Sequence, residues 1–148
     1  MTEPLRAVFD TNVFVSALLS RNPTSPTQEL MRRWRAEEFV LLVSQALLIE
    51  LVEKLQERGI GQDQIQELLA TINRLTEWVK VSPEAVVPVI TADPDDDQIL
   101  ACAVVGRAHY LVTYDPHSDL LEGIYRGIKV TKALPFLWKV RGDQPPEP

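Results

Sequence analysis

The sequence predicts an α/β protein built as a three-layer α/β/α sandwich around a central, mainly parallel sheet. Short apolar runs, typical of buried strands, alternate along the chain with longer segments whose apolar residues recur at helical spacing. The 148 residues fit one domain with a substantial core, and 45% of them are hydrophobic, as in ordinary globular proteins. We therefore expect a single domain over residues 1–141, followed by a disordered tail over 142–148.

The first strand, turn and helix are expected in the stretch LRAVFDTNVFVSALLS, residues 5–20. An apolar run ends abruptly at Asp10, and after Thr11 and Asn12 an apolar helical segment follows that is broken only by Ser16. Open parallel sheets place their ligand crevices at the carboxyl ends of the strands. A carboxylate at the end of a buried first strand is therefore a candidate metal ligand.

The rest of the chain continues the alternation of strands and helices. A Ser-Pro pair predicts a helix start at residue 25, and Ser44 is expected to cap a helix that ends near Gly59. An acidic run at 93–97 leads into an apolar helix that Gly106 ends. The other expected elements are strands at 39–43, 78–81, 110–113 and 128–130, helices at 62–76 and 131–140, and a loop or edge segment at 82–91.

Charge and hydropathy narrow the classes of function. The formal net charge of −6 argues against a protein that coats nucleic acid by bulk positive charge, but not against an enzyme that approaches phosphates through bound metal. No apolar run approaches the roughly 20 residues needed to span a bilayer, and the first residues lack the pattern of a signal peptide. The single cysteine, Cys102, lies in an apolar run and is expected in the core. We expect a cytoplasmic protein without membrane association.

Four acidic residues occupy positions that a parallel sheet can bring together. Several neighbouring carboxylates cannot all stay ionised without a compensating cation, and hard oxygen ligands favour Mg²⁺ or Mn²⁺. One or two such ions can activate water and stabilise the leaving oxygen in phosphodiester cleavage. The four are Asp10 after the first strand, Glu50 early in the helix after the second strand, Asp97 at the start of the short apolar helix, and Asp115 after the strand that ends at Thr113.

Each of these acids also has an ordinary structural explanation, and Asp10 could simply terminate a strand or cap a helix. Asp97 could simply complement a helix dipole, and periodicity cannot choose between it, Asp95 and Asp96 because the helix is apolar nearly all round. Asp115 alone could be a turn residue, and Glu50 lies off the centre of the apolar stripe of its helix, as a surface residue would. The individual positions therefore leave the choice open.

Three uncharged polar residues could assist such a site. Asn12 and Thr113 can hydrogen-bond a carboxylate, a metal-bound water or a phosphate. Ser16 lies one turn beyond Asn12 on the same helix face and could do likewise, or could equally be a satisfied hydroxyl within a packed helix.

The order of the motifs resembles the PIN-domain family and, within it, the toxin components of toxin–antitoxin pairs (VapC-like ribonucleases). The matching segments run from about residue 5 to 121 and cover most of the chain. Asp-Thr-Asn alone is a weak signal, whereas all three segments in order are a specific one. The segments are VFDTNVFVSALLS, LVSQALLIELVEKL and DPDDDQILACAVVGRAHYLVTYD.

The resemblance implies a small PIN-like α/β fold with an acidic Mg²⁺ or Mn²⁺ site that cleaves RNA. It also implies a homodimer and a protein antitoxin as partner. The site residues carried over by motif are Asp10 as first acid, Asn12 as its polar companion, Glu50 in the Ser-to-Glu-Leu helix, Asp97 before Ile-Leu-Ala-Cys-Ala, and Thr113 with Asp115 as Thr-x-Asp.

Three hypotheses of different classes follow. The first is a metal-dependent endoribonuclease that acts as a toxin. The second is another phosphoryl-transfer α/β protein, a phosphatase or a receiver domain, although Phe9 stands where a receiver usually has a second acid beside Asp10. The third is a non-catalytic PIN-like module that binds RNA or a protein.

Overall fold

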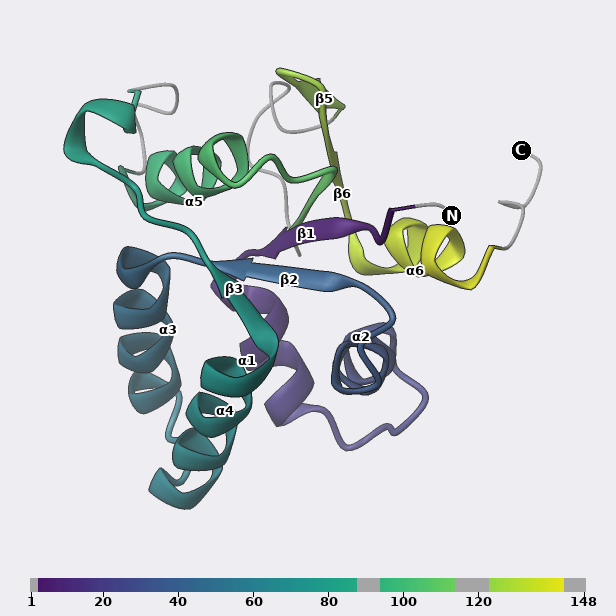
Figure 1. Cartoon of the computed structure of the whole chain (residues 1–148). Helices are drawn as coiled ribbons and strands as arrows, with labels where there is room; N and C mark the ends of the chain where they lie inside the picture. Colours follow the sequence, from purple (N-terminus) through teal and green to yellow (C-terminus); the bar gives the residue numbers. More distant parts are fainter. Residues whose placement is uncertain (1–2, 88–93, 114–122, 143–148) are drawn as a thin grey trace.

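The computed structural model confirms the predicted α/β/α architecture (Figure 1). It describes residues 3–87, 94–113 and 123–142, with the side chains of 94–96 excepted. Of the tail predicted over 142–148, only Gly142 lies within these ranges. The elements are β1 (Arg6–Phe9), α1 (Thr11–Leu19), α2 (Pro26–Arg35), β2 (Val40–Val43), α3 (Gln45–Glu57), α4 (Gln62–Leu75), β3 (Thr76–Trp78), the short 3₁₀ helix η1 (Pro83–Ala85), α5 (Pro94–Val105), β4 (Tyr110–Val112), β5 (Ile124–Tyr125), β6 (Ile128–Thr131) and α6 (Ala133–Arg141).

The sheet has β1 near its centre. Its six strands lie in the order β3-β2-β1-β4-β6-β5, and every neighbouring pair is parallel except β5 and β6. The first strand therefore has β2 on one side and β4 on the other. Because these three strands are parallel, their carboxyl ends lie at one edge of the sheet, which we call the carboxyl edge.

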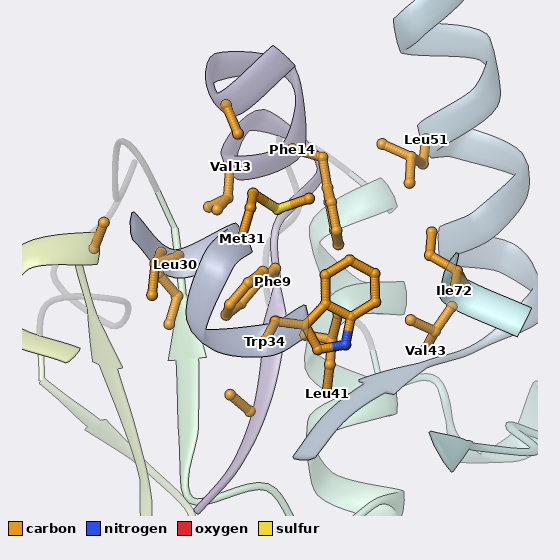
Figure 2. Close-up of a cluster of buried hydrophobic side chains, with 14 of the residues drawn as sticks. Phe9, Val13, Phe14, Leu30, Met31, Trp34, Leu41, Val43, Leu51 and Ile72 are labelled. Atoms are coloured by element: carbon orange, nitrogen blue, oxygen red, sulfur yellow. The ribbon is translucent and has the colours of Figure 1, made fainter. Parts of the chain in front are cut away.

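The two faces of the sheet carry separate hydrophobic cores. Alternate residues of a strand point to opposite faces, so Ala7 and Phe9 pack on one side and Val8 on the other. The larger core lies beneath α1, α2, α3, α4 and α6, and Figure 2 shows Phe9 and Trp34 within it. The smaller core lies beneath α5, which alone among the described helices of more than one turn covers that face (Figure 1).

The predicted helix caps are confirmed where the structure describes them. Ser25 Oγ accepts a hydrogen bond from the backbone N–H of Gln28, and Ser44 Oγ accepts one from Leu47 N–H, each 3.3 Å long. Just beyond α3, Gly59 adopts a φ of 74°, a conformation that glycine tolerates without strain. Local sequence chemistry is therefore enough to set where these helices begin and end.

Two strand predictions differ from the structure because pairing partners decide them. The strand expected at 78–81 lies at Thr76–Trp78, where Thr76 pairs with Leu41 directly after α4 ends. The short strand β5 was not predicted at all. It pairs with β6 through a tight turn in which Arg126 and Gly127 both have positive φ, as a type I′ hairpin requires.

No helix in residues 3–87, 94–113 and 123–142 is long and apolar enough to cross a membrane.

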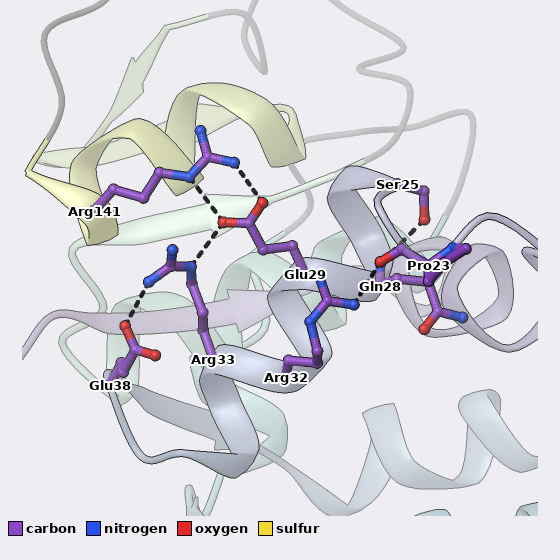
Figure 3. A network of polar contacts seen from close by, with 8 residues as sticks. All are labelled: Pro23, Ser25, Gln28, Glu29, Arg32, Arg33, Glu38 and Arg141. Atoms are coloured by element: carbon purple, nitrogen blue, oxygen red, sulfur yellow. Dashed lines mark hydrogen bonds and ion pairs between the residues drawn. The ribbon is translucent and has the colours of Figure 1, made fainter.

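An ionic network joins α2 to α6 on the surface (Figure 3). The Glu29 carboxylate accepts hydrogen bonds from Arg141 of α6, one of them 2.8 Å from Nε, and from Nε of Arg33 at 2.7 Å. Arg33 also donates to Glu38 at 2.6 Å. The hydrogen bonds from Arg141, and then those from Arg33, lower the pKa of Glu29 from 4.5 to about 2, while burial acts in the opposite direction.

This network predicts a pH-dependent stability. The pKa of Glu29 is lower in the folded chain than in the unfolded chain. The ionised carboxylate therefore contributes fully to the free energy of unfolding above about pH 4.5, and this contribution is lost as the pH falls toward 2. At pH 7 we expect Glu29→Gln to cost about 1–2 kcal/mol after allowance for solvent screening, with the difference from the wild type vanishing near pH 2. Urea unfolding across this range measures it, with Glu38→Gln as the weaker control. A cost that stayed constant with pH would contradict the assignment.

Candidate functional site at the carboxyl edge of the sheet

Asp10 marks the point where β1 gives way to α1. Its backbone N–H donates to the carbonyl of Val112 at 2.8 Å, which extends the pairing of β1 with β4 by one residue. Its carbonyl accepts from Val13 N–H at 3.0 Å and begins the helix. The Asp10 side chain makes no capping hydrogen bond to α1 and is only 9% exposed. The backbone therefore holds a buried carboxylate at the carboxyl edge without using it as a helix cap.

Thr113 contacts this carboxylate directly. Its backbone N–H donates to the carbonyl of Thr131 at 2.9 Å, so the residue is anchored to β6 just after β4 ends. Its hydroxyl donates to Asp10 Oδ2 at 2.9 Å, and Thr11 makes a longer contact of 3.4 Å to Oδ1. From the sequence, Thr113 was expected only to be able to hydrogen-bond a carboxylate, and the two strands were not known to be neighbours. The structure pairs β1 with β4 and brings the side chains of Asp10 and Thr113 together. The contact with Thr11 was not predicted.

Asp97 lies in the first turn of α5, which runs back across the sheet between β3 and β4. Because this helix is antiparallel to the strands that it joins, it begins over the carboxyl edge (Figure 1). The Asp97 side chain is 7% exposed, in the range of Asp10. The side chains of Asp95 and Asp96 lie outside the described residues, so the choice among the three acids rests on the burial of Asp97 alone.

A small pocket opens beside Asp97, and sequence reasoning missed two residues of its lining. Tyr125 and Arg126 belong to the hairpin of β5 and β6 and line the pocket together with Leu100 and Val104 of α5. The Arg126 guanidinium carbon lies 5.6 Å from the centre of the Tyr125 ring, within the range of a cation–π contact. An Arg-Gly pair before an apolar strand is the sequence signal that could have indicated this turn.

For the remaining two acids, Glu50 and Asp115, the structure gives less information. Glu50 lies in the second turn of α3 and is half-buried, and that helix begins at Ser44, at the carboxyl end of β2. Asp115 lies outside the described residues. The structure therefore positions three of the four predicted acids on elements that start or end at the carboxyl edge.

The two polar residues predicted on α1 lie together on its surface. Asn12 is exposed, and Ser16 is half-buried with its hydroxyl 3.3 Å from that of Thr27 on α2. Both line an open groove with Arg58, which the sequence did not single out. Ser16 therefore has a structural partner as well as access to this groove.

The donor chemistry fits a hard divalent cation, although the described residues do not complete a metal site. Among the described side chains, no three His, Cys, Asp or Glu residues lie close enough to hold an ion. Asp10 and Asp97 are nevertheless buried carboxylates, and the two hydrogen bonds that described residues donate to the Asp10 carboxylate come from uncharged hydroxyls. A buried carboxylate with hydroxyl contacts favours a cation beside it. Asp115 would have to supply further oxygen ligands.

Cys102 takes no part in this chemistry. Cys102 lies on the face of α5 that packs into the smaller core. Burial there raises the pKa of its thiol to about 12, and hydrogen bonding with Ser44 opposes this only partly. The group is uncharged at neutral pH, and the thiolate is the reactive form of cysteine. The expectation that Cys102 is a core residue is confirmed.

A family model described as a PIN domain matches residues 6–117 of the chain. This range begins with β1 and includes every candidate site residue, Asp115 among them. No curated protein matches the sequence.

Proposed function

The chain belongs to the PIN-domain family, whose members are generally nucleases that use divalent metals, and we propose that it is a metal-dependent endoribonuclease. The observation that carries the proposal is the buried Asp10 carboxylate, oriented by the Thr113 hydroxyl at the carboxyl edge of the central strands. This is the position at which parallel sheets present ligand-binding groups. The reaction that we propose is hydrolysis of RNA phosphodiester bonds.

In this proposal Asp10, Glu50, Asp97 and Asp115 hold Mg²⁺ or Mn²⁺. When bound, such an ion would provide Lewis-acid chemistry: activation of a water and stabilisation of the leaving oxygen of the phosphodiester. The Thr113 hydroxyl fixes one oxygen of Asp10 by its 2.9 Å hydrogen bond and so limits the orientations of the carboxylate.

Two residues of α1 complete the proposed arrangement toward the substrate. Asn12 is exposed two residues after Asp10, so its amide can donate to a phosphate oxygen or to a metal-bound water. Ser16 follows one turn later, and its hydroxyl can contact the same strand of RNA. Both are positioning residues in this proposal.

The biological role that we propose is that of the toxin in a toxin–antitoxin pair. Its support is the resemblance of three segments, in order, to the toxin components of such pairs. The proposal includes a protein antitoxin and a homodimer as assemblies of the chain in the cytoplasm. Light scattering at micromolar concentration tests the homodimer, which a monomer would contradict.

The test of the activity is cleavage of a mixed pool of labelled RNAs by the purified chain in Mg²⁺, in Mn²⁺ and in EDTA. We expect fragments with either metal, none in EDTA, and recovery when metal is returned in excess. Cleavage that persisted in EDTA would contradict a metal-dependent mechanism. Calorimetry with Mn²⁺ accompanies the assay, because a chain that neither cuts RNA nor binds the metal would support a non-catalytic binding module.

A further inference from the structure

We propose that the groove along α1, which ends at Arg58, binds the RNA backbone next to the cleavage site. This inference deepens the proposed nuclease function and rests on it. The groove is lined by residues of α1 and by the residue that caps α3 at its C-terminal end. These residues are Asn12, Val15, Ser16, Leu19, Ser20 and Arg58.

The groove leads away from the proposed site of cleavage. Asn12, at its beginning, follows Asp10 by two residues, and Leu19 lies in the last turn of α1. At a rise of about 1.5 Å per residue, these two ends are about 10 Å apart along the helix. Since α1 and α3 both begin at the carboxyl edge, their C-terminal ends lie together on the side remote from Asp10. An RNA strand cut near Asp10 could therefore continue along this surface.

Arg58 supplies the charge that such a groove needs. It is exposed, and its side chain contacts no carboxylate within the described ranges. Arg6 and Arg33, by contrast, are paired with Glu77 and Glu29. The net charge of the chain is −6, and within the described ranges Arg58 has no carboxylate partner and the groove beside it is lined by uncharged residues. Such an arginine creates a local positive site for phosphate.

The other side chains of the groove suit a sugar–phosphate chain. The hydroxyl of Ser20 donates to Ser25 Oγ at 3.1 Å, and that of Ser16 lies 3.3 Å from Thr27 Oγ1, so both are held in fixed positions. Amide, hydroxyl and guanidinium groups are those that contact phosphate and sugar in nucleic-acid complexes. Leu19, 42% exposed, adds one apolar contact for a ribose or a base edge.

The same lining argues against a protein helix as the occupant. A helix docks through several apolar anchors in a hydrophobic groove. Here Leu19 is exposed while Val15 is buried, so the groove offers one exposed apolar side chain rather than a row of apolar anchors. A segment of RNA therefore fits its chemistry better than an apolar helix of a partner protein.

The experiment measures binding of a fluorescent, mixed-sequence single-stranded RNA by anisotropy in EDTA, where cleavage does not interfere, across a range of salt concentrations. The variants are Arg58→Ala, Arg58→Lys and, as matched control, Arg74→Ala, which removes an exposed arginine of α4. The logarithm of the binding constant falls linearly with the logarithm of the salt concentration, and the steepness of this line is the salt slope. Loss of one phosphate contact lowers the salt slope of single-strand binding by about 0.7, which amounts to about fivefold weaker binding at 0.1 M salt. We expect this for Arg58→Ala, partial retention for Arg58→Lys, and wild-type binding for Arg74→Ala.

The outcomes separate this inference from the proposed function. Equal affinity and salt slope for Arg58→Ala and the wild type, in a chain that still cleaves RNA with metal, would overturn the groove alone. Absence of both RNA binding and cleavage in the wild type would overturn both. A change of oligomeric state on Arg58→Ala, seen by light scattering without a change in RNA binding, would assign the groove to a protein and overturn the RNA proposal.

Discussion

Asp10→Asn is expected to lower metal-dependent RNA cleavage by about 10³-fold or more while the fold stays intact. The amide has nearly the shape of the carboxylate and can still accept from Thr113, so the 2.9 Å contact survives. What it loses is the negative charge, which the proposed cation requires. Initial rates on labelled RNA with Mn²⁺ measure the effect, and circular dichroism verifies the fold.

Two further variants make this result specific. Asp63→Asn removes an exposed acid from the first turn of α4 and should leave the rate unchanged. Thr113→Val removes the hydroxyl that orients Asp10 and should cost about 10–100-fold, because outer hydrogen-bond partners of metal ligands have effects of that size. Added Mn²⁺ should partly restore Thr113→Val but not Asp10→Asn. A fully active Asp10→Asn chain would disprove its role as a ligand.

Trp34→Ala is expected to lower the free energy of unfolding by about 3–5 kcal/mol. The side chain is fully buried in the larger core, where its ring packs edge-on against Phe14 with the centres 6.4 Å apart (Figure 2). Truncation removes a large apolar area and leaves a cavity that the surrounding helices cannot fill completely. Urea unfolding followed by circular dichroism measures the loss.

The conservative variant Trp34→Phe separates packing from hydrogen bonding. Among the described residues, the buried indole N–H of Trp34 has no hydrogen-bond partner. A phenylalanine keeps a ring against Phe14 and removes this unsatisfied donor, so part of the packing loss is offset. We expect Trp34→Phe to lower the free energy of unfolding by much less than Trp34→Ala does. Equal costs for the two variants would show that the indole N–H contributes to stability.

Much of the fold could be predicted because local chemistry decides it. Ser25 and Ser44 cap helices through their own hydroxyls, and these contacts lie within three residues of the cap. The apolar run before Asp10 is buried whichever strands flank it. The strand and the acid that ends it could therefore be placed without knowledge of the rest of the chain.

Elements defined by their partners could not be placed in this way. Strand β3 begins at Thr76 because Leu41 pairs with it, and β5 exists because a tight turn folds Ile124 back against Lys129. Such short strands carry almost no periodic signal of their own. The same holds for Arg58, which enters the groove with Asn12 only because α1 packs beside α3.

The sequence by itself therefore determined the alternation of strands and helices, the helix caps and the chemical type of the candidate site. Capping and burial of an apolar run depend on residues close together in the chain, so a pattern can reveal them. The tertiary structure decided that Thr113 orients Asp10 across 103 residues, and that Asp97 is a buried acid on a helix that begins at the same edge. Contacts between distant residues depend on strand order and helix direction, which periodicity does not encode.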